Sequence, residues 1–153
     1  MSSSYKRLLN EFKNINFLKE IVSYKLYTIN AHNIMFRCDI DLIYQKIKYK
    51  IKIFYNNYYP FECPIKIEIN NYNIFSLYKK IMQKNNNLFD NCIYCNSILC
   101  SNNWNISLNI INILDEIKKI IEYNKLYIKR ILLNKIIIKY TNQNMDYLHK
   151  YLI

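Results

Sequence analysis

The sequence predicts an α+β fold in which helices flank one antiparallel sheet. Apolar residues recur at helical spacing near both ends of the chain, and four strand-like segments follow one another between them. Short connections between consecutive strands favour an antiparallel meander over parallel strands with crossover helices. A chain of 153 residues without a linker or an internal repeat fits a single domain spanning 1–153.

The first predicted element is a helix from about Tyr5 to Ile21. Its apolar residues recur at three- and four-residue spacing, namely Leu8, Leu9, Phe12, Ile15 and either Leu18 or Ile21. Ser3 or Ser4 offers a side-chain oxygen that can cap the first turn. The spacing therefore predicts an amphipathic helix that packs on the sheet.

Four segments rich in β-branched and aromatic residues predict the strands, at 21–30, 33–41, 46–55 and 65–70. The third segment is the clearest because apolar and basic residues alternate along it. Ile47, Tyr49, Ile51 and Ile53 alternate there with Lys46, Lys48, Lys50 and Lys52. Such a strand has one buried face and one face in water.

The rest of the chain predicts helices after an irregular stretch. Residues 71–91 show no clean period and leave room for one short helix. From Ile110 the apolar residues return at helical spacing, and a further helical segment is expected over 125–139. Since the chain contains no glycine, we expect asparagine to occupy backbone positions with positive φ.

The formal net charge of +11 is weak evidence for a nucleic-acid partner. The abundance of Ile, Lys, Asn and Tyr together with the absence of Gly indicates an AT-rich genome, which raises the lysine content by itself. The lysines of the third strand are first interpreted as a solvated face. No apolar run is long enough to span a membrane, and no signal peptide is evident, so we expect an intracellular protein, cytoplasmic or also nuclear, with reduced cysteines.

Three of the five cysteines lie in the stretch CIYCNSILCSNNW, which runs from Cys92 to the only tryptophan, Trp104. Three interpretations compete. Cys95 can be a nucleophile, because a thiolate attacks and leaves readily near neutral pH. It can equally be a buried thiol, or Cys92, Cys95 and Cys100 can hold zinc with a fourth ligand from elsewhere. One Cys-x-x-Cys without a second pair is a weak zinc signal, so we expect neither a metal nor a cofactor.

Four segments resemble the ubiquitin-conjugating enzymes, in the right order along the chain. YYPFECP matches the Tyr-Pro-Phe-x-x-Pro signature of that family, and YCNSIL matches the stretch around its active-site cysteine, with Cys95 as the nucleophile. The segment from Trp104 and the first helix, with Lys6 and Arg7, match as well. The resemblance implies a ubiquitin-conjugating-enzyme-like fold with an N-terminal helix, a four-stranded antiparallel meander, an active-site segment and C-terminal helices.

The sequence also departs from that family. The His-Pro-Asn motif that precedes the cysteine is absent, and the spacing from Pro64 to Cys95 is longer than in typical members. The motif would normally supply a side-chain amide near the developing oxyanion. Asn85, Asn86, Asn87 and Asn91 are the candidates to replace it, and of these we predict Asn87. Its cysteine-rich stretch around Cys95 makes the chain similar to divergent viral members of the family, whose active-site segments are also rich in cysteine.

The resemblance also implies partners. Cys95 would accept ubiquitin or a ubiquitin-like modifier from an activating enzyme and pass it to a lysine, alone or with a ubiquitin ligase. Lys6 and Arg7 would meet the activating enzyme, and Phe61 with Asn105, Ile106 and Ser107 would meet the ligase. Three functions are therefore open: the active enzyme, a non-catalytic variant that binds ubiquitin or a partner, and, below both, a basic adaptor or nucleic-acid binder unrelated to ubiquitin.

Overall fold

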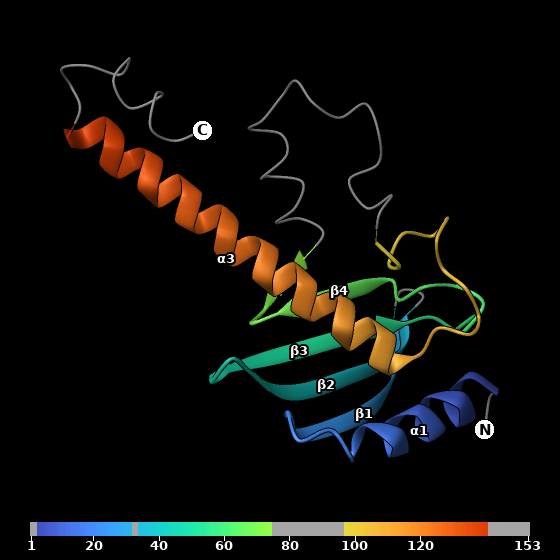
Figure 1. The fold of residues 1–153 in the computed structure, drawn as a ribbon. Coiled ribbons are helices and arrows are strands. Elements are labelled where there is room, and N and C mark those ends of the chain that lie inside the picture. The colour runs from blue at the N-terminus through green and yellow to red at the C-terminus, as the bar shows by residue number, and fades with distance from the viewer. Residues whose placement is uncertain (1–2, 32–33, 75–96, 141–153) are drawn as a thin grey trace. The chain divides into compact units, whose positions relative to one another are not determined.

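The computed structural model describes residues 3–31, 34–74 and 97–140 (Figure 1). The elements, in chain order, are α1 (Ser3–Ile15), β1 (Ile21–Ala31), β2 (Ile34–Tyr44), β3 (Ile47–Tyr55), β4 (Lys66–Ile69), β5 (Tyr72–Asn73) and α3 (Ile110–Tyr140). The predicted α+β class is confirmed: an N-terminal helix, an antiparallel sheet and a C-terminal helix are all present. The chain forms two compact units, Met1–Glu116 and Ile117–Ile153, which share α3. The single domain over 1–153 stays a prediction.

The sheet contains five strands in the order β1-β2-β3-β4-β5, and every neighbouring pair is antiparallel. The expected number of four strands is therefore wrong by one short strand. Asn70 and Asn71 take positive φ angles of 51° and 68°, so the chain reverses within two residues. Tyr72 then pairs with Ile69 and adds β5 to the edge of the sheet.

A second two-residue turn joins β2 to β3, where Tyr44 pairs with Ile47. Gln45 and Lys46 lie at its tip with φ angles of 49° and 64°. Left-handed backbone of this kind costs a residue with a β-carbon free energy, and glycine or asparagine usually occupies it. The expected use of asparagine is thus confirmed at 70–71, while 45–46 carry two long side chains instead.

Helix α1 packs its apolar stripe against the inner face of the sheet. Leu8, Phe12 and Ile15 are buried, and the ring of Phe12 lies 5.3 Å from that of Tyr24 on β1. The helix ends at Ile15 rather than near Ile21, because the backbone N–H of Leu18 donates to the Ile15 carbonyl and turns the chain. Ile21 consequently begins β1, where it pairs with Leu42.

The inner positions of the strands alternate as the sequence predicts. On β3, Tyr49, Ile51, Ile53 and Tyr55 are buried, whereas Ile47 at the start of the strand is 47% exposed. The same alternation on β2 buries Phe36, Cys38, Ile40 and Leu42. These side chains, with those of α1 and the first turns of α3, make up the core of the first unit.

Helix α3 is one continuous helix of 31 residues, not the two segments expected. Neither glycine nor proline occurs between Ile110 and Tyr140, so nothing in the sequence interrupts its hydrogen-bond ladder. No helix among residues 3–31, 34–74 and 97–140 is long and apolar enough to cross a membrane.

Candidate functional site

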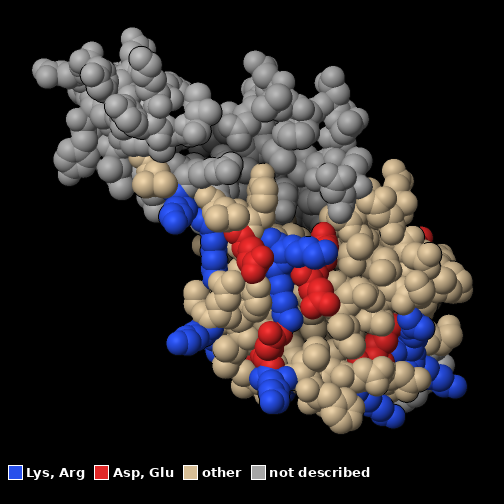
Figure 2. All heavy atoms as spheres, in the orientation of Figure 1, with Lys and Arg blue, Asp and Glu red and all other residues tan. Residues whose placement is uncertain are grey.

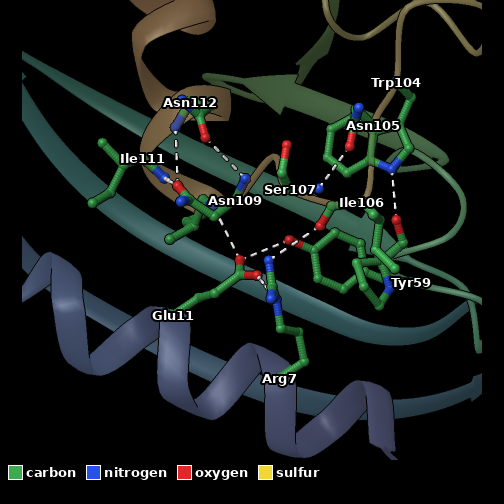
Figure 3. Close-up of polar contacts among 12 residues, drawn as sticks. Arg7, Glu11, Tyr59, Trp104, Asn105, Ile106, Ser107, Asn109, Ile111 and Asn112 are labelled. Carbon is green, nitrogen blue, oxygen red and sulfur yellow. Dashed lines mark hydrogen bonds and ion pairs between the residues drawn. The ribbon is translucent and has the colours of Figure 1, made fainter.

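Glu11 is the centre of a polar cluster that joins three segments of the first unit (Figure 3). Its Oε1 pairs with the Arg7 Nε one turn earlier on α1 at 2.5 Å. Its Oε2 accepts hydrogen bonds from the Tyr59 hydroxyl at 2.7 Å and from the backbone N–H of Ile110 at 3.0 Å. Glu11 is 5% exposed, so its buried charge is matched by one cation and two donors.

The backbone N–H that donates to Glu11 belongs to Ile110, the first residue of α3. Asn109 and Asn112 form a reciprocal cap at this helix start. Asn109 Oδ1 accepts from the N–H groups of Ile111 and Asn112 at 2.9 and 3.3 Å. Asn112 Oδ1 in turn accepts from the Asn109 N–H at 3.0 Å. A helix start leaves N–H groups without partners and carries partial positive charge, so two amides and a carboxylate suit this end.

A second contact joins Trp104, at the end of the cysteine stretch, to the connection between β3 and β4 (Figure 3). The Trp104 indole N–H donates to the Pro60 carbonyl at 2.8 Å. The Tyr59 ring lies 6.0 Å from that of Trp104 and 4.6 Å from that of Tyr55. Burial, and then the nearby Glu11 carboxylate, raise the pKa of the Tyr59 hydroxyl, which keeps it a neutral donor.

The segment that begins at Ser97 is folded tightly on itself. The Ser97 carbonyl accepts from the Cys100 N–H at 3.1 Å and from the Asn103 side chain at 3.0 Å. The Cys100 carbonyl accepts from the backbone N–H groups of Asn103 and Trp104 at 2.9 and 3.0 Å. Residues 97–104 therefore form a compact turn that Trp104 anchors to Pro60, and in the sequence this turn begins two positions after Cys95.

The predicted partner-binding residues gather in two adjoining places. The Phe61 side chain is 75% exposed beside Pro60, and Ile106 is 49% exposed in the Asn105–Ser107 loop after Trp104. Asn105 Oδ1 accepts from the Ser107 N–H at 2.9 Å, which shapes that loop. Lys6 is exposed on α1.

Arg7 differs from Lys6, because its side chain is used within the protein. Besides its pair with Glu11, its guanidinium donates to the Ile106 carbonyl at 3.3 Å. This contact brings α1 next to the Asn105–Ser107 loop. Arg7 therefore has a structural role that its position on a helix surface did not suggest.

The predicted catalytic residues, Cys95 and Asn87, lie outside the described residues, as does Cys92. Cys38, Cys63 and Cys100 are free thiols in the described part of the chain. Burial raises the pKa of the Cys38 thiol, so this residue is an unreactive core side chain and not an alternative to Cys95 as the nucleophile. Within the described ranges no three His, Cys, Asp or Glu side chains are grouped to hold a metal. The zinc alternative needs Cys92 and Cys95 and stays open.

The outer face of the sheet is not a uniformly basic surface. Lys48 pairs with Asp41 at 2.9 Å, Arg37 pairs with Asp39 at 2.9 Å, and Lys66 pairs with Glu68. Strand register also places Lys25, Asp39, Lys52 and Glu68 in one row of alternating sign across four strands. Such pairs contribute little stability each, but they neutralise the lysines locally. Basic and acidic side chains also lie next to each other on the face drawn in Figure 2.

Sequence reasoning missed the role of Glu11 and Tyr59. Arg7 and Glu11 are one helical turn apart, a spacing that is typical of ion pairs on a helix surface. Nothing local indicated that the carboxylate would be buried against Ile110, a residue on another helix. The sequence shows Tyr59 and Pro60 as part of a motif, but no local pattern predicts that the Pro60 carbonyl accepts a hydrogen bond from Trp104.

Comparisons with known protein families, with curated proteins and with solved structures found no significant match for this chain. The candidate site therefore rests on the residues and contacts described above.

Proposed function

We propose that the chain is a ubiquitin-conjugating-enzyme-like protein that carries ubiquitin or a related modifier as a thioester on Cys95. One observation carries the proposal: the Trp104 indole bonds to the Pro60 carbonyl. The Tyr-Pro-Phe segment and the cysteine-to-tryptophan segment bear the most specific resemblance to that family. Trp104, the last residue of the second segment, bonds to the first segment although the two positions are far apart in the sequence.

The chemistry would proceed by two acyl transfers. The Cys95 thiolate attacks the thioester carbonyl of the activated modifier, and the thiolate of the activating enzyme leaves. A lysine amine then attacks the new thioester, loses its proton, and the Cys95 thiolate leaves. Each step passes through a tetrahedral oxyanion, which a positioned donor stabilises. We assign this donor to the Asn87 side-chain amide.

The partner surface would lie at the end of the first unit where Phe61 and Ile106 are exposed. Exposed apolar side chains next to polar loops suit a partner interface. Because Arg7 bonds to the Ile106 carbonyl, the α1 surface with Lys6 and the Asn105–Ser107 loop adjoin each other. An activating enzyme and a ligase would then compete for one region.

A thioester charging assay tests the proposal. The chain is mixed with an activating enzyme, ATP and ubiquitin or a ubiquitin-like modifier, and the products are run on a non-reducing gel. We expect a reducible adduct that Cys95→Ala abolishes and that Cys92→Ala and Cys100→Ala retain. The absence of an adduct with every modifier would contradict the proposal that the chain is a conjugating enzyme. It would favour the alternative, a non-catalytic module that binds ubiquitin or a partner protein.

Asn87→Ala tests the assigned oxyanion donor. Charging should persist, while discharge of the charged protein to free lysine should slow by a factor of about 100 or more. Asn86→Ala is the matched control, because it removes the same amide one position earlier. Equal discharge rates for both variants would remove Asn87 from the mechanism.

A further inference from the structure

A pocket of about 490 Å³ lies between the β3–β4 connection and the segment before α3. It is lined by Asn56, Phe61, Glu62, Cys63, Ile65, Ser101 and Trp104. The volume is in the range of pockets that hold ligands or side chains. Every lining residue belongs to the first unit, so the pocket is a feature of that unit alone.

Four of the seven lining residues are apolar, namely Phe61, Cys63, Ile65 and Trp104, and part of this apolar wall is held in place. Trp104 is held by its bond to Pro60 and by the neighbouring Tyr59 ring. Phe61 and Ile65 are 75% and 43% exposed, so the wall continues outward as an apolar rim. Burial raises the pKa of the Cys63 thiol, which keeps that lining group uncharged.

Glu62 adds one negative charge to these apolar walls. Its Oε2 accepts a hydrogen bond from the Asn56 side-chain amide, which orients the carboxylate without neutralising it. Within the described part of the chain, no Lys or Arg forms an ion pair with Glu62. This contrasts with the sheet, where Asp39, Asp41 and Glu68 all have basic partners. In a chain with net charge +11, a carboxylate that no described Lys or Arg neutralises is available to an external cation.

We propose that this pocket binds a lysine or arginine side chain of a partner polypeptide. The aliphatic stem of that side chain lies along Phe61, Ile65 and Trp104, and its charged head meets the Glu62 carboxylate. Long basic side chains combine an apolar stem with a cationic end, and aromatic rings attract cations, so the pocket matches both parts. This inference adds the chemistry of one partner to the proposed function but does not require a thioester on Cys95.

The test uses two short peptides, acetyl-Leu-Arg-Leu-amide and acetyl-Leu-Gln-Leu-amide. Trp104 is the only tryptophan, so its fluorescence and its single indole N–H NMR signal report directly on the pocket. We expect the arginine peptide to shift both signals and to bind about fivefold or more tightly than the glutamine peptide. Glu62→Gln keeps the shape and can still accept from Asn56, yet it should abolish this preference.

Glu20→Gln is the matched control, because it removes one carboxylate just before β1, and Glu20 does not line the pocket. It should keep the preference for arginine. Equal affinity for the two peptides, a preference that survives in Glu62→Gln, or an unchanged Trp104 signal would each overturn the proposal. Binding by Cys95→Ala should equal that of the unmodified chain, which separates a failure of this inference from a failure to charge with a modifier.

Discussion

Tyr55 and Tyr59 are buried beside each other, and among the described residues only the Tyr59 hydroxyl has a hydrogen-bond partner. The Tyr59 hydroxyl donates to Glu11, whereas the Tyr55 hydroxyl has no hydrogen-bond partner among the described residues. A buried hydroxyl without a partner costs free energy, while a buried bond to a carboxylate stabilises the fold. The same substitution should therefore have opposite effects at the two positions.

Tyr59→Phe should lower the free energy of unfolding by about 1.5–3 kcal/mol, because Glu11 loses a donor inside the protein. Tyr55→Phe should leave it unchanged or raise it by up to about 1 kcal/mol, because the substitution removes an unsatisfied group. Urea unfolding followed by circular dichroism measures both. Equal destabilisation by the two variants would contradict the assignment of the Glu11 bond.

At the scale of elements, the β2–β3 turn departs from the residues that its backbone favours. Gln45 and Lys46 both hold positive φ, which costs a residue with a β-carbon about 1–2 kcal/mol. Lys46→Gly should raise the free energy of unfolding by up to about 1 kcal/mol, since the flexibility of glycine in the unfolded chain offsets part of the gain.

Lys48→Gly is the variant to compare with Lys46→Gly, because it places glycine in the strand, two residues after the turn position. It lies within β3 and pairs with Asp41, so glycine there should destabilise the fold. Thermal unfolding of both variants decides the matter. If Lys46→Gly were also destabilising, the turn conformation would be wrong.

Local patterns predicted the elements well where one face of an element is buried. The alternation of apolar residues with lysine predicted a strand at 46–55, one residue longer than β3, and it predicted which face is buried. Two errors had different causes. β5 has only two residues, too few to show a period. α1 ends at Ile15 although apolar residues continue at helical spacing, so there the period was misleading. The candidate site was partly predictable through its motifs, but the bond from Glu11 to Ile110 joins two helices and leaves no local pattern.

At the scale of the whole molecule, the net charge of +11 does not translate into one basic sheet face. The lysines of β3 lie among Asp39, Asp41 and Glu68, and strand register fixes that arrangement. The pKa of Asp41 is lowered, chiefly by its hydrogen bond to Lys48, which agrees with this neutralisation. Overall charge is therefore a poor guide to partners here, and the carboxylate at Glu62 is the more specific feature.

Buried acids in the core give the fold a characteristic response to alkali. Burial raises the pKa of the Cys38 thiol and of the Tyr55 and Tyr59 hydroxyls, so all three stay protonated in the folded chain. In the unfolded chain they ionise near pH 8.5 for cysteine and near pH 10 for tyrosine. Their contribution to stability is thus complete below those values and is lost as the pH rises above them, by up to about 1.4 kcal/mol per pH unit for each group.

Urea unfolding between pH 7 and pH 10.5 should show this decline in the free energy of unfolding. Cys38→Ala should make the decline less steep between about pH 8.5 and pH 9.5, where the thiol of the unfolded chain ionises. Cys63→Ala, which removes a half-buried thiol, should flatten it less. A slope that Cys38→Ala leaves unchanged would contradict the burial of this thiol.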